Sequence, residues 1–208
     1  MAQFRAMTMA GLLLLTGSAA KAQQTAGWKA GAAIPYSMDS LSSFTNRTLM
    51  GLCLDGAYQV PVADSTTFIR LGLGLNAFPG QEKTSGTLTR KVSFMSEQVT
   101  ADVIVPISTS RWALVAGISA NNWHVNSTLR DSSDPAMEGT SGAVKKVFGK
   151  FGFRTGLEYQ VASRLALTAL FQQTELGSDA RLRKGGDDIY GYQGINPSWI
   201  QVGIRYSF

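Results

Sequence analysis

The last thirteen residues, Asn196 to Phe208, constrain the fold of this chain more than any other stretch. Large apolar side chains occupy every second position near the end, namely Ile200, Val202, Ile204, Tyr206 and Phe208. Apart from Trp199, the positions between them are polar or glycine. A period of two predicts a β-strand with one apolar and one polar face. The sequence stops on an aromatic residue, with no polar tail after the apolar face.

The N-terminus has the pattern of a secretory signal peptide. Arg5 precedes an apolar stretch from Ala6 to Ala20, and Ala20-Lys21-Ala22 has the small-x-small form of a cleavage site. A retained membrane anchor is disfavoured because the apolar run is shorter than the ~20 residues that a spanning helix needs. We therefore expect residues 1–22 to be removed, so that the mature chain begins near Gln23.

Composition suits one domain, residues 23–208. The 208 residues carry 19 basic and 14 acidic side chains, and loss of Arg5 and Lys21 with the signal peptide lowers the net charge from +5 to +3. This charge is too weak to indicate nucleic-acid binding. Cys53 is the only cysteine, which excludes an intrachain disulfide and favours a packed thiol. A membrane location would require a closed barrel, since lipid leaves backbone polar groups unsatisfied otherwise.

Eight segments alternate between apolar and polar side chains and are predicted to be strands. They are Trp28–Tyr36, Thr48–Val60, Thr67–Phe78, Val92–Ile107, Trp112–Trp123, Lys145–Val161, Leu165–Leu176 and Asn196–Phe208. The sixth is the clearest: Val147, Phe151 and Leu157 share one face, and Lys146, Lys150 and Arg154 share the other. Alternating strands of about 9–11 residues separated by turn signals are typical of a transmembrane barrel.

The connections alternate in length. Three are short, at Pro61–Thr66, Ser108–Arg111 and Ala162–Arg164. Four are long and rich in Gly, Ser, Asp and Asn, at Ser37–Arg47, Pro79–Lys91, Val125–Val144 and Gly177–Pro197. The predicted fold is therefore all-β: an eight-stranded antiparallel up-and-down transmembrane β-barrel with short periplasmic turns and four long extracellular loops.

Aromatic residues cluster near the short-turn ends of the predicted strands. They are Trp28, Tyr58, Phe68, Trp112, Tyr159, Tyr206 and Phe208. Such girdles sit at membrane interfaces. Phe68 is out of phase with the apolar face of its strand and is assigned to the turn.

The inward-facing charges decide whether the barrel conducts, because eight strands leave an interior that side chains can fill. Five of these charges are predicted near the short-turn end: Asp55, Arg70, Asp102, Glu158 and Arg205. Arg154 lies about one layer higher, with Lys150 and Lys146 above it. Three acids and three bases at adjacent depths predict a salt-bridged layer and a blocked lumen, since unpaired buried charges are costly.

One set of residues could carry chemistry. His124 is the only histidine, and Ser127 and Glu138 follow it, which suggests the logic of a nucleophilic triad. If the strand continues past His124, a spacing of three puts Ser127 on the opposite face. Enzymes of the lipid A deacylase family place the two residues two apart, so this sequence departs from that pattern. No sequence motif indicates a metal or cofactor.

The fourth long connection carries a basic group, Arg181, Arg183 and Lys184, before Asp187 and Asp188. Basic residues at the outer rim of a barrel would contact lipopolysaccharide phosphates. The alternative is a solvated loop of mixed charge.

The terminal strand resembles the C-terminal signal strand of bacterial outer-membrane barrels, which ends in Phe with an aromatic residue two positions earlier. Tyr206 and Phe208 match that pattern, and the resemblance implies that the barrel-assembly machinery reads them. The whole mature chain resembles, as a pattern, the small barrels of the OmpA membrane-domain and OmpX kind and the porin family. This resemblance implies a location in the outer membrane of a Gram-negative bacterium, with its lipids and lipopolysaccharide as partners.

No catalytic residue carries over from the resemblance. The favoured function is therefore a non-enzymatic structural or surface-interaction role, with an unknown extracellular ligand. The alternatives are a narrow, porin-like solute channel, a lipid A-modifying enzyme and, more weakly, a soluble ligand-carrying barrel with its apolar faces inward.

Overall fold

A computed structural model of the chain describes residues 24–38, 50–62, 66–107, 110–131, 143–174, 181–184, 187–191 and 197–208. None of these residues forms a helix long and apolar enough to cross a membrane. The signal peptide predicted at residues 1–22 lies outside the described residues.

Eight antiparallel strands close into a barrel. They are β1 (Gly27–Met38), β2 (Leu52–Pro61), β3 (Phe68–Ser85), β4 (Leu88–Pro106), β5 (Trp112–Asp131), β6 (Ala143–Ala162), β7 (Leu165–Thr174) and β10 (Ser198–Ser207). Their order around the barrel is β1-β10-β7-β6-β5-β4-β3-β2, so each strand pairs with its neighbours in sequence and the barrel closes between β1 and β10. Two further strands, β8 (Arg181–Lys184) and β9 (Asp187–Gly191), form a separate hairpin. The predicted eight-stranded antiparallel barrel is confirmed.

The seam between β1 and β10 shows why the terminal alternation matters. Ala32 pairs with Ile204 and Ile34 with Val202, so apolar positions of both strands point to the same, outer side. Beyond the last paired position, the backbone N–H of Phe208 donates to the carbonyl of Trp28 at 3.1 Å.

The outer wall is mainly apolar and the buried charged side chains point inward, as the alternation predicts. On β6, Phe151 is 72% exposed on the outer wall, and Leu157 is also exposed. Arg154, in the opposite phase of the same strand, is only 3% exposed. The reverse sorting expected of a soluble ligand-carrying barrel is therefore absent from the described strands.

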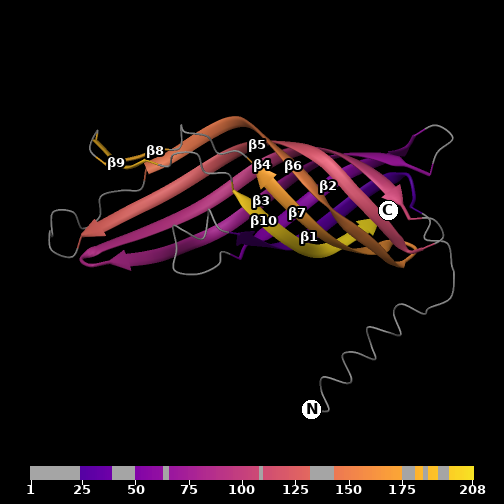
Figure 1. The fold of residues 1–208 in the computed structure, drawn as a ribbon, viewed down its shortest axis with the longest axis horizontal. Helices are drawn as coiled ribbons and strands as arrows, with labels where there is room; N and C mark the ends of the chain where they lie inside the picture. Colours follow the sequence, from indigo (N-terminus) through magenta and orange to yellow (C-terminus); the bar gives the residue numbers. More distant parts are fainter. Residues whose placement is uncertain are drawn as a thin grey trace, which may run out of the picture.

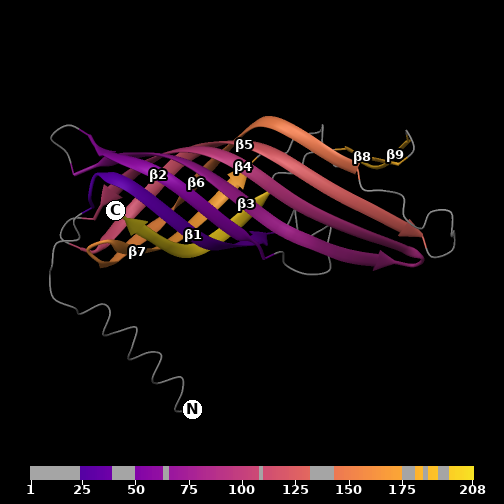
Figure 2. The ribbon, with the colours of Figure 1, turned by 180° about the vertical axis from the view of Figure 1, so that it is seen from behind.

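Four strands extend well beyond the other four. The consecutive strands β3 to β6 have 18 to 20 residues, whereas β1, β2, β7 and β10 have 10 to 12. Both views show this extension at the end of the barrel opposite the C-terminus, with the β8–β9 hairpin also at that end (Figures 1 and 2).

The extension differs from the prediction of a long loop at Pro79–Lys91. β3 and β4 remain paired up to Ser85 and Leu88, so the connection is a turn at Gly86 and Thr87. Gly86 has a positive φ of 63°, which a glycine adopts at no steric cost. Cross-strand pairs support the extension, because Lys91 and Glu82 form an ion pair at 3.6 Å and the hydroxyls of Thr84 and Thr89 lie 3.0 Å apart.

The loop predicted at Val125–Val144 is also shorter, since β5 runs to Asp131 and β6 starts at Ala143. A bulge interrupts the β5–β6 register between Asn121 and Trp123. Gly149 lies in this bulge with a φ of 66°. Beyond it, Val147 is the register partner of Trp123, and Lys146 is the register partner of His124. The pairing of β6 with β5 is therefore shifted by one residue beyond the bulge.

Phe68 also differs from its prediction. It is the first residue of β3 and packs inside the barrel against a buried cluster of Ile104, Ala113, Val115 and Leu170. It therefore belongs to the interior core and not to the turn or the outer girdle.

Candidate functional site: the barrel interior

The interior contains an ionic layer made of the six charged residues selected from the sequence, Asp55, Arg70, Asp102, Arg154, Glu158 and Arg205. Glu158 is its centre. Arg70 donates from Nη2 to both Glu158 carboxylate oxygens, at 2.9 and 3.2 Å. Arg205 donates from Nη1 to Glu158 Oε2 at 3.3 Å, and from Nη2 to Asp55 Oδ2 at 2.8 Å. Arg154 Nε and Asp102 Oδ1 form a further ion pair at 3.0 Å.

The Arg70–Glu158 ion pair crosses the interior. Arg70 is on β3 and Glu158 on β6, and these strands are not neighbours in the barrel. Five of the six residues are almost fully buried, and Asp55 is half-buried. Three carboxylates balance three guanidiniums, which is the arrangement in which buried charges are tolerated. The predicted salt-bridged interior is present in the structure.

Two glycines make room for the carboxylates of this layer. A Cβ added at Gly31 would collide with the Asp55 side chain, and one at Gly117 would collide with Asp102 and the Ala101 carbonyl. Both glycines lie in the inward phase of their strands. The ionic layer therefore depends on small neighbours as well as on its charges.

The residues that precede β1 close the same end of the barrel. Gln24 donates from Nε2 to Glu158 Oε1 at 2.9 Å, and its side-chain carbonyl oxygen accepts from Gln59 at 3.2 Å. Lys29 is buried and donates to Ser207 Oγ at 2.7 Å and to Thr25 Oγ1 at 3.0 Å. The start of the described chain is thus tied into the ionic layer by hydrogen bonds.

A polar network of amides and hydroxyls also spans the barrel. Gln172 of β7 donates to Gln98 Oε1 of β4 at 2.8 Å, although β7 and β4 are not adjacent. Asn121 donates to Ser119 at 2.9 Å and accepts from Ser96 at 3.3 Å. Hydrogen-bonded side chains therefore also cross the interior at this level.

An aromatic layer, consisting of Phe78, Phe94, Trp123 and Trp199, forms a second closure. All four side chains are buried, and Trp123 and Trp199 are 0% exposed. Trp199 of β10 meets Trp123 of β5 with ring centroids 5.9 Å apart and Phe78 of β3 at 5.8 Å, both edge to face. Because β10 is adjacent to neither β3 nor β5, these rings cross the lumen.

The His124 side chain lies on the outer wall and not in the interior. Its Nε2 is 3.5 Å from Glu97 Oε1, and Glu97 is itself outward and exposed. β5 continues through position 127, which pairs with Val92, so positions 124 and 127 belong to opposite strand faces. Glu138 lies outside the described residues. The backbone geometry of β5 therefore does not favour a dyad of His124 and Ser127.

The other selected residues lie at the two ends of the barrel. Arg181, Arg183 and Lys184 are all in β8, paired with residues 187–191 of β9, and their side chains are outside the described part of the structure. Tyr206 and Phe208 point outward at the opposite end, with ring centroids 5.3 Å apart. Among the described residues, no group of three or more His, Cys, Asp or Glu could hold a metal ion.

The sequence interpretation missed Gln24, Lys29, the polar network and the aromatic layer. A usable signal existed for most of them, because Lys29, Trp123 and Trp199 all fall in the inward phase of their strands. Phase, and not hydrophobicity, decides which way a strand residue points.

No protein-family model matches the chain. No curated protein matches it either. Similar solved structures include three that match over most of their length. A major outer membrane protein from Thermus thermophilus has a TM-score of 0.52 and 12% identity, covering 89% of this chain and 100% of that one. Neisserial surface protein A has a TM-score of 0.51 and 15% identity, with 87% and 96% covered. Ail, the attachment invasion locus protein of Yersinia pestis, has a TM-score of 0.50 and 13% identity, with 88% and 97% covered.

At this level of identity the likeness concerns the fold. The chain has the fold of the small eight-stranded outer-membrane β-barrels. Within that class, its interior is of the salt-bridged, side-chain-filled kind.

Proposed function

We propose that this chain is a non-enzymatic outer-membrane protein whose barrel is a closed anchor and whose projecting strands bind a macromolecule outside the cell. The observation that carries the proposal is the continuous extension of β3, β4, β5 and β6 beyond the other four strands (Figure 1). A sheet of this length is not needed to cross a bilayer, since about 9–11 residues per strand suffice.

The projecting part has strand edges that suit protein binding. β2 pairs with β3 only as far as Ala77, and β7 pairs with β6 only from Gly152. Within the described residues, the barrel partners of β3 and β6 therefore end where the extension begins. Unpaired N–H and C=O groups along such an edge are a template for an extended segment of another protein.

The filled interior supports an anchor over the alternative of a narrow solute channel. The ionic layer and the aromatic layer both cross the lumen. Reconstitution in planar bilayers tests this directly, and we expect no steady conductance steps. Regular steps in the nanosiemens range would favour the channel and contradict the closed anchor.

The binding role is tested by trimming one hairpin. Replacing Gln81–Val92 by a short Gly-Asn turn removes the upper part of β3 and β4 and leaves the barrel pairs intact. Wild-type and trimmed protein in nanodiscs would be compared on a panel of immobilised extracellular proteins. Binding that the trimmed variant loses supports the proposal, and identical binding profiles oppose it.

The proposal also includes three expectations from the sequence, on export and location, on assembly and on contact with lipopolysaccharide. Residues 1–22 would direct export and be cleaved, and the chain would have the outer membrane as its location. Tyr206 and Phe208 would be the assembly signal that the barrel-assembly machinery reads. Arg181, Arg183 and Lys184 would contact lipopolysaccharide phosphates, which the location of β8 at the end opposite the C-terminus supports (Figure 1).

A further inference from the structure

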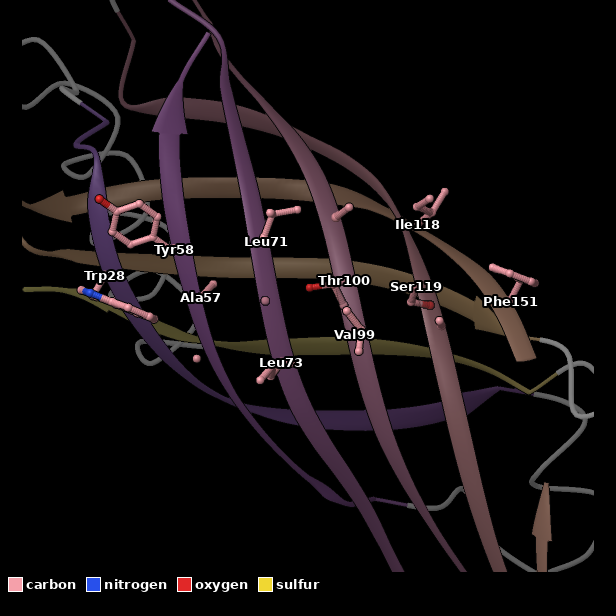
Figure 3. Close-up of a pocket in the computed structure, with 14 residues that line it drawn as sticks. Trp28, Ala57, Tyr58, Leu71, Leu73, Val99, Thr100, Ile118, Ser119 and Phe151 are labelled. Atoms are coloured by element: carbon pink, nitrogen blue, oxygen red, sulfur yellow. The ribbon is translucent and has the colours of Figure 1, made fainter. Parts of the chain in front are cut away.

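A groove crosses the outer wall of the barrel between two neighbouring rows of side chains. One row contains the register partners Gly56, Leu73, Val99, Ala120 and Phe151, and the next contains Tyr58, Leu71, Ala101 and Ile118. The groove encloses about 430 Å³. Figure 3 shows Trp28 and Tyr58 at one end, Phe151 at the other, and Leu71, Leu73, Val99 and Ile118 between them.

We propose that this groove binds one hydrocarbon chain of a membrane lipid. The inference rests on the proposed membrane location of the barrel and adds a specific lipid site to it.

Small residues on the outer wall create the groove. Gly56 lies on β2 between Leu54 and Tyr58, which are large, exposed and in the same outward phase. A Cβ built at Gly56 meets no atom within 4 Å, so the space above it is open. Ala101 and Ala120 are likewise small outward residues beside larger ones on β4 and β5. The depression therefore follows from missing side chains in an otherwise large apolar wall.

The chemistry of the lining fits a hydrocarbon and not a polar ligand. The outward side chains are apolar apart from the Tyr58 hydroxyl and the Trp28 indole N–H, both at one end. The backbone of the floor is paired in the barrel ladders, so it offers no unpaired donor or acceptor. The volume lies within the range of about 300–1,000 Å³ that is usual for ligand pockets. The groove is also continuous with the apolar wall that faces lipid in a barrel of this class.

A second copy of the barrel fits the groove less well. Trp28 at one end and Phe151 at the other are 65% and 72% exposed, so both rings stand out from the wall. The convex wall of another barrel would meet these rings before it reached the floor. A lipid hydrocarbon chain is flexible and only one methylene group wide, so it can lie on the floor of the groove between these two rings.

The direction of the groove distinguishes a bound chain from surrounding lipid. Register rows run perpendicular to the strands, and the strands of such barrels tilt by about 35–45° from the membrane normal. A chain in the groove would thus lie oblique to the bulk chains and exchange with them more slowly.

Native mass spectrometry tests the proposal. The protein would be released from detergent micelles containing palmitoyl-oleoyl phosphatidylethanolamine as the probe lipid. The test variant is Gly56→Leu/Ala120→Leu, which fills the floor. The control is Ala169→Leu on β7, an outward position of the same wall that does not line the groove. A gel shift between unheated and boiled samples shows that each variant is folded.

We expect wild type and the Ala169→Leu control to retain one lipid at collision energies that strip the rest. The fraction of the filled variant that keeps a bound lipid would be about tenfold lower. This is the loss expected when about two methylene groups of the lipid lose their contact with the groove. Equal retention by all three proteins, or none by wild type, overturns the inference. A protein dimer that only the filled variant loses overturns it in favour of a second copy.

Flotation with vesicles of the same lipid separates this inference from the proposed function. Protein that fails to float with vesicles refutes the membrane location and the lipid site together. Protein that floats but shows no groove-dependent lipid retention refutes the lipid site alone.

Discussion

Asp55 and Arg205 are joined by an ion pair of 2.8 Å that passes over Gly31, the register partner of both, although 150 residues separate them in the sequence. Arg205 also contacts Glu158, which in turn contacts Arg70. Charged residues of β2, β3, β6 and β10 are thereby linked into one network of ion pairs. Loss of a central residue such as Glu158 should therefore affect the whole ionic layer.

Glu158→Ala should therefore be strongly destabilising. It leaves Arg70 and Arg205 without their shared carboxylate, and breaking a buried ion pair in this way costs about 3–5 kcal/mol. Urea unfolding of the protein in lipid vesicles measures the change. Glu82→Ala is the matched control, since its pair with Lys91 at 3.6 Å is solvent-exposed and should contribute at most about 1 kcal/mol. Similar effects for the two variants would contradict the assigned role of the ionic layer.

Gly117→Ala should destabilise the barrel through a steric clash. The added Cβ would fall on the Asp102 side chain and the Ala101 carbonyl, and overpacking of this kind costs about 1–3 kcal/mol. Gly56→Ala is the control, because its Cβ would meet open space on the outer wall. Unfolding midpoints in urea compare the two. A Gly117→Ala midpoint as high as that of Gly56→Ala would show that the carboxylate does not need this gap.

The loss of one interior layer should not make the barrel conduct. Trp199→Ala removes the ring that meets Phe78 and Trp123, but the ionic layer still crosses the lumen. We expect planar-bilayer recordings to show no steps for Trp199→Ala, for Glu158→Ala or for the double variant, because the Gln172–Gln98 pair also spans the barrel. Conductance in either single variant would mean that one layer alone closes the barrel.

Cys53 offers a direct check of which face of β2 points inward. Its side chain is 1% exposed and lies in the inward phase of the strand. A maleimide should leave the folded protein unlabelled and label the unfolded protein fully, as mass spectrometry would reveal. In a Cys53→Ala/Leu52→Cys variant, the thiol moves to the outward neighbour and should react in the folded state in detergent. Rapid labelling of native Cys53 would require a different register for β2.

Phe208→Ala tests the proposed assembly signal. Phe208 and Tyr206 pack edge to face on the outer wall, so the substitution removes one ring at the very end of the barrel. We expect slower insertion into vesicles that contain the barrel-assembly machinery, with unchanged spontaneous folding in detergent. Ala169→Leu, elsewhere on the wall, should insert at the wild-type rate. Equal slowing in detergent would point to a general folding defect.

Alternation alone was enough to predict the barrel, its strand count and the ionic layer. Arg154, Glu158 and Arg205 could be assigned to the interior because each follows an outward apolar residue, namely Phe153, Leu157 and Ile204. A strand offers only two faces, so phase carries most of the information.

The bulge, the hairpin extension and the contacts across the lumen could not be read in this way. At Gly149 one extra residue reverses the phase, and nothing in a period of two marks that position. The extension beyond Phe78 depends on pairs such as Thr84 with Thr89 in a stretch rich in turn-forming residues. Partners such as Gln172 and Gln98 are set by barrel curvature, which brings together strands that share no ladder.

The pairing of β1 with β10 has a consequence for biogenesis. Ten positions of β1, from Lys29 to Met38, have their partners in Ser198–Ser207, the last strand of the chain. A polypeptide that lacked that strand would form an open sheet. Its two edge strands would have unpaired N–H and C=O groups that could pair with other copies. The barrel can therefore close only after Ser198–Ser207 has been synthesised, because this strand is the pairing partner of β1.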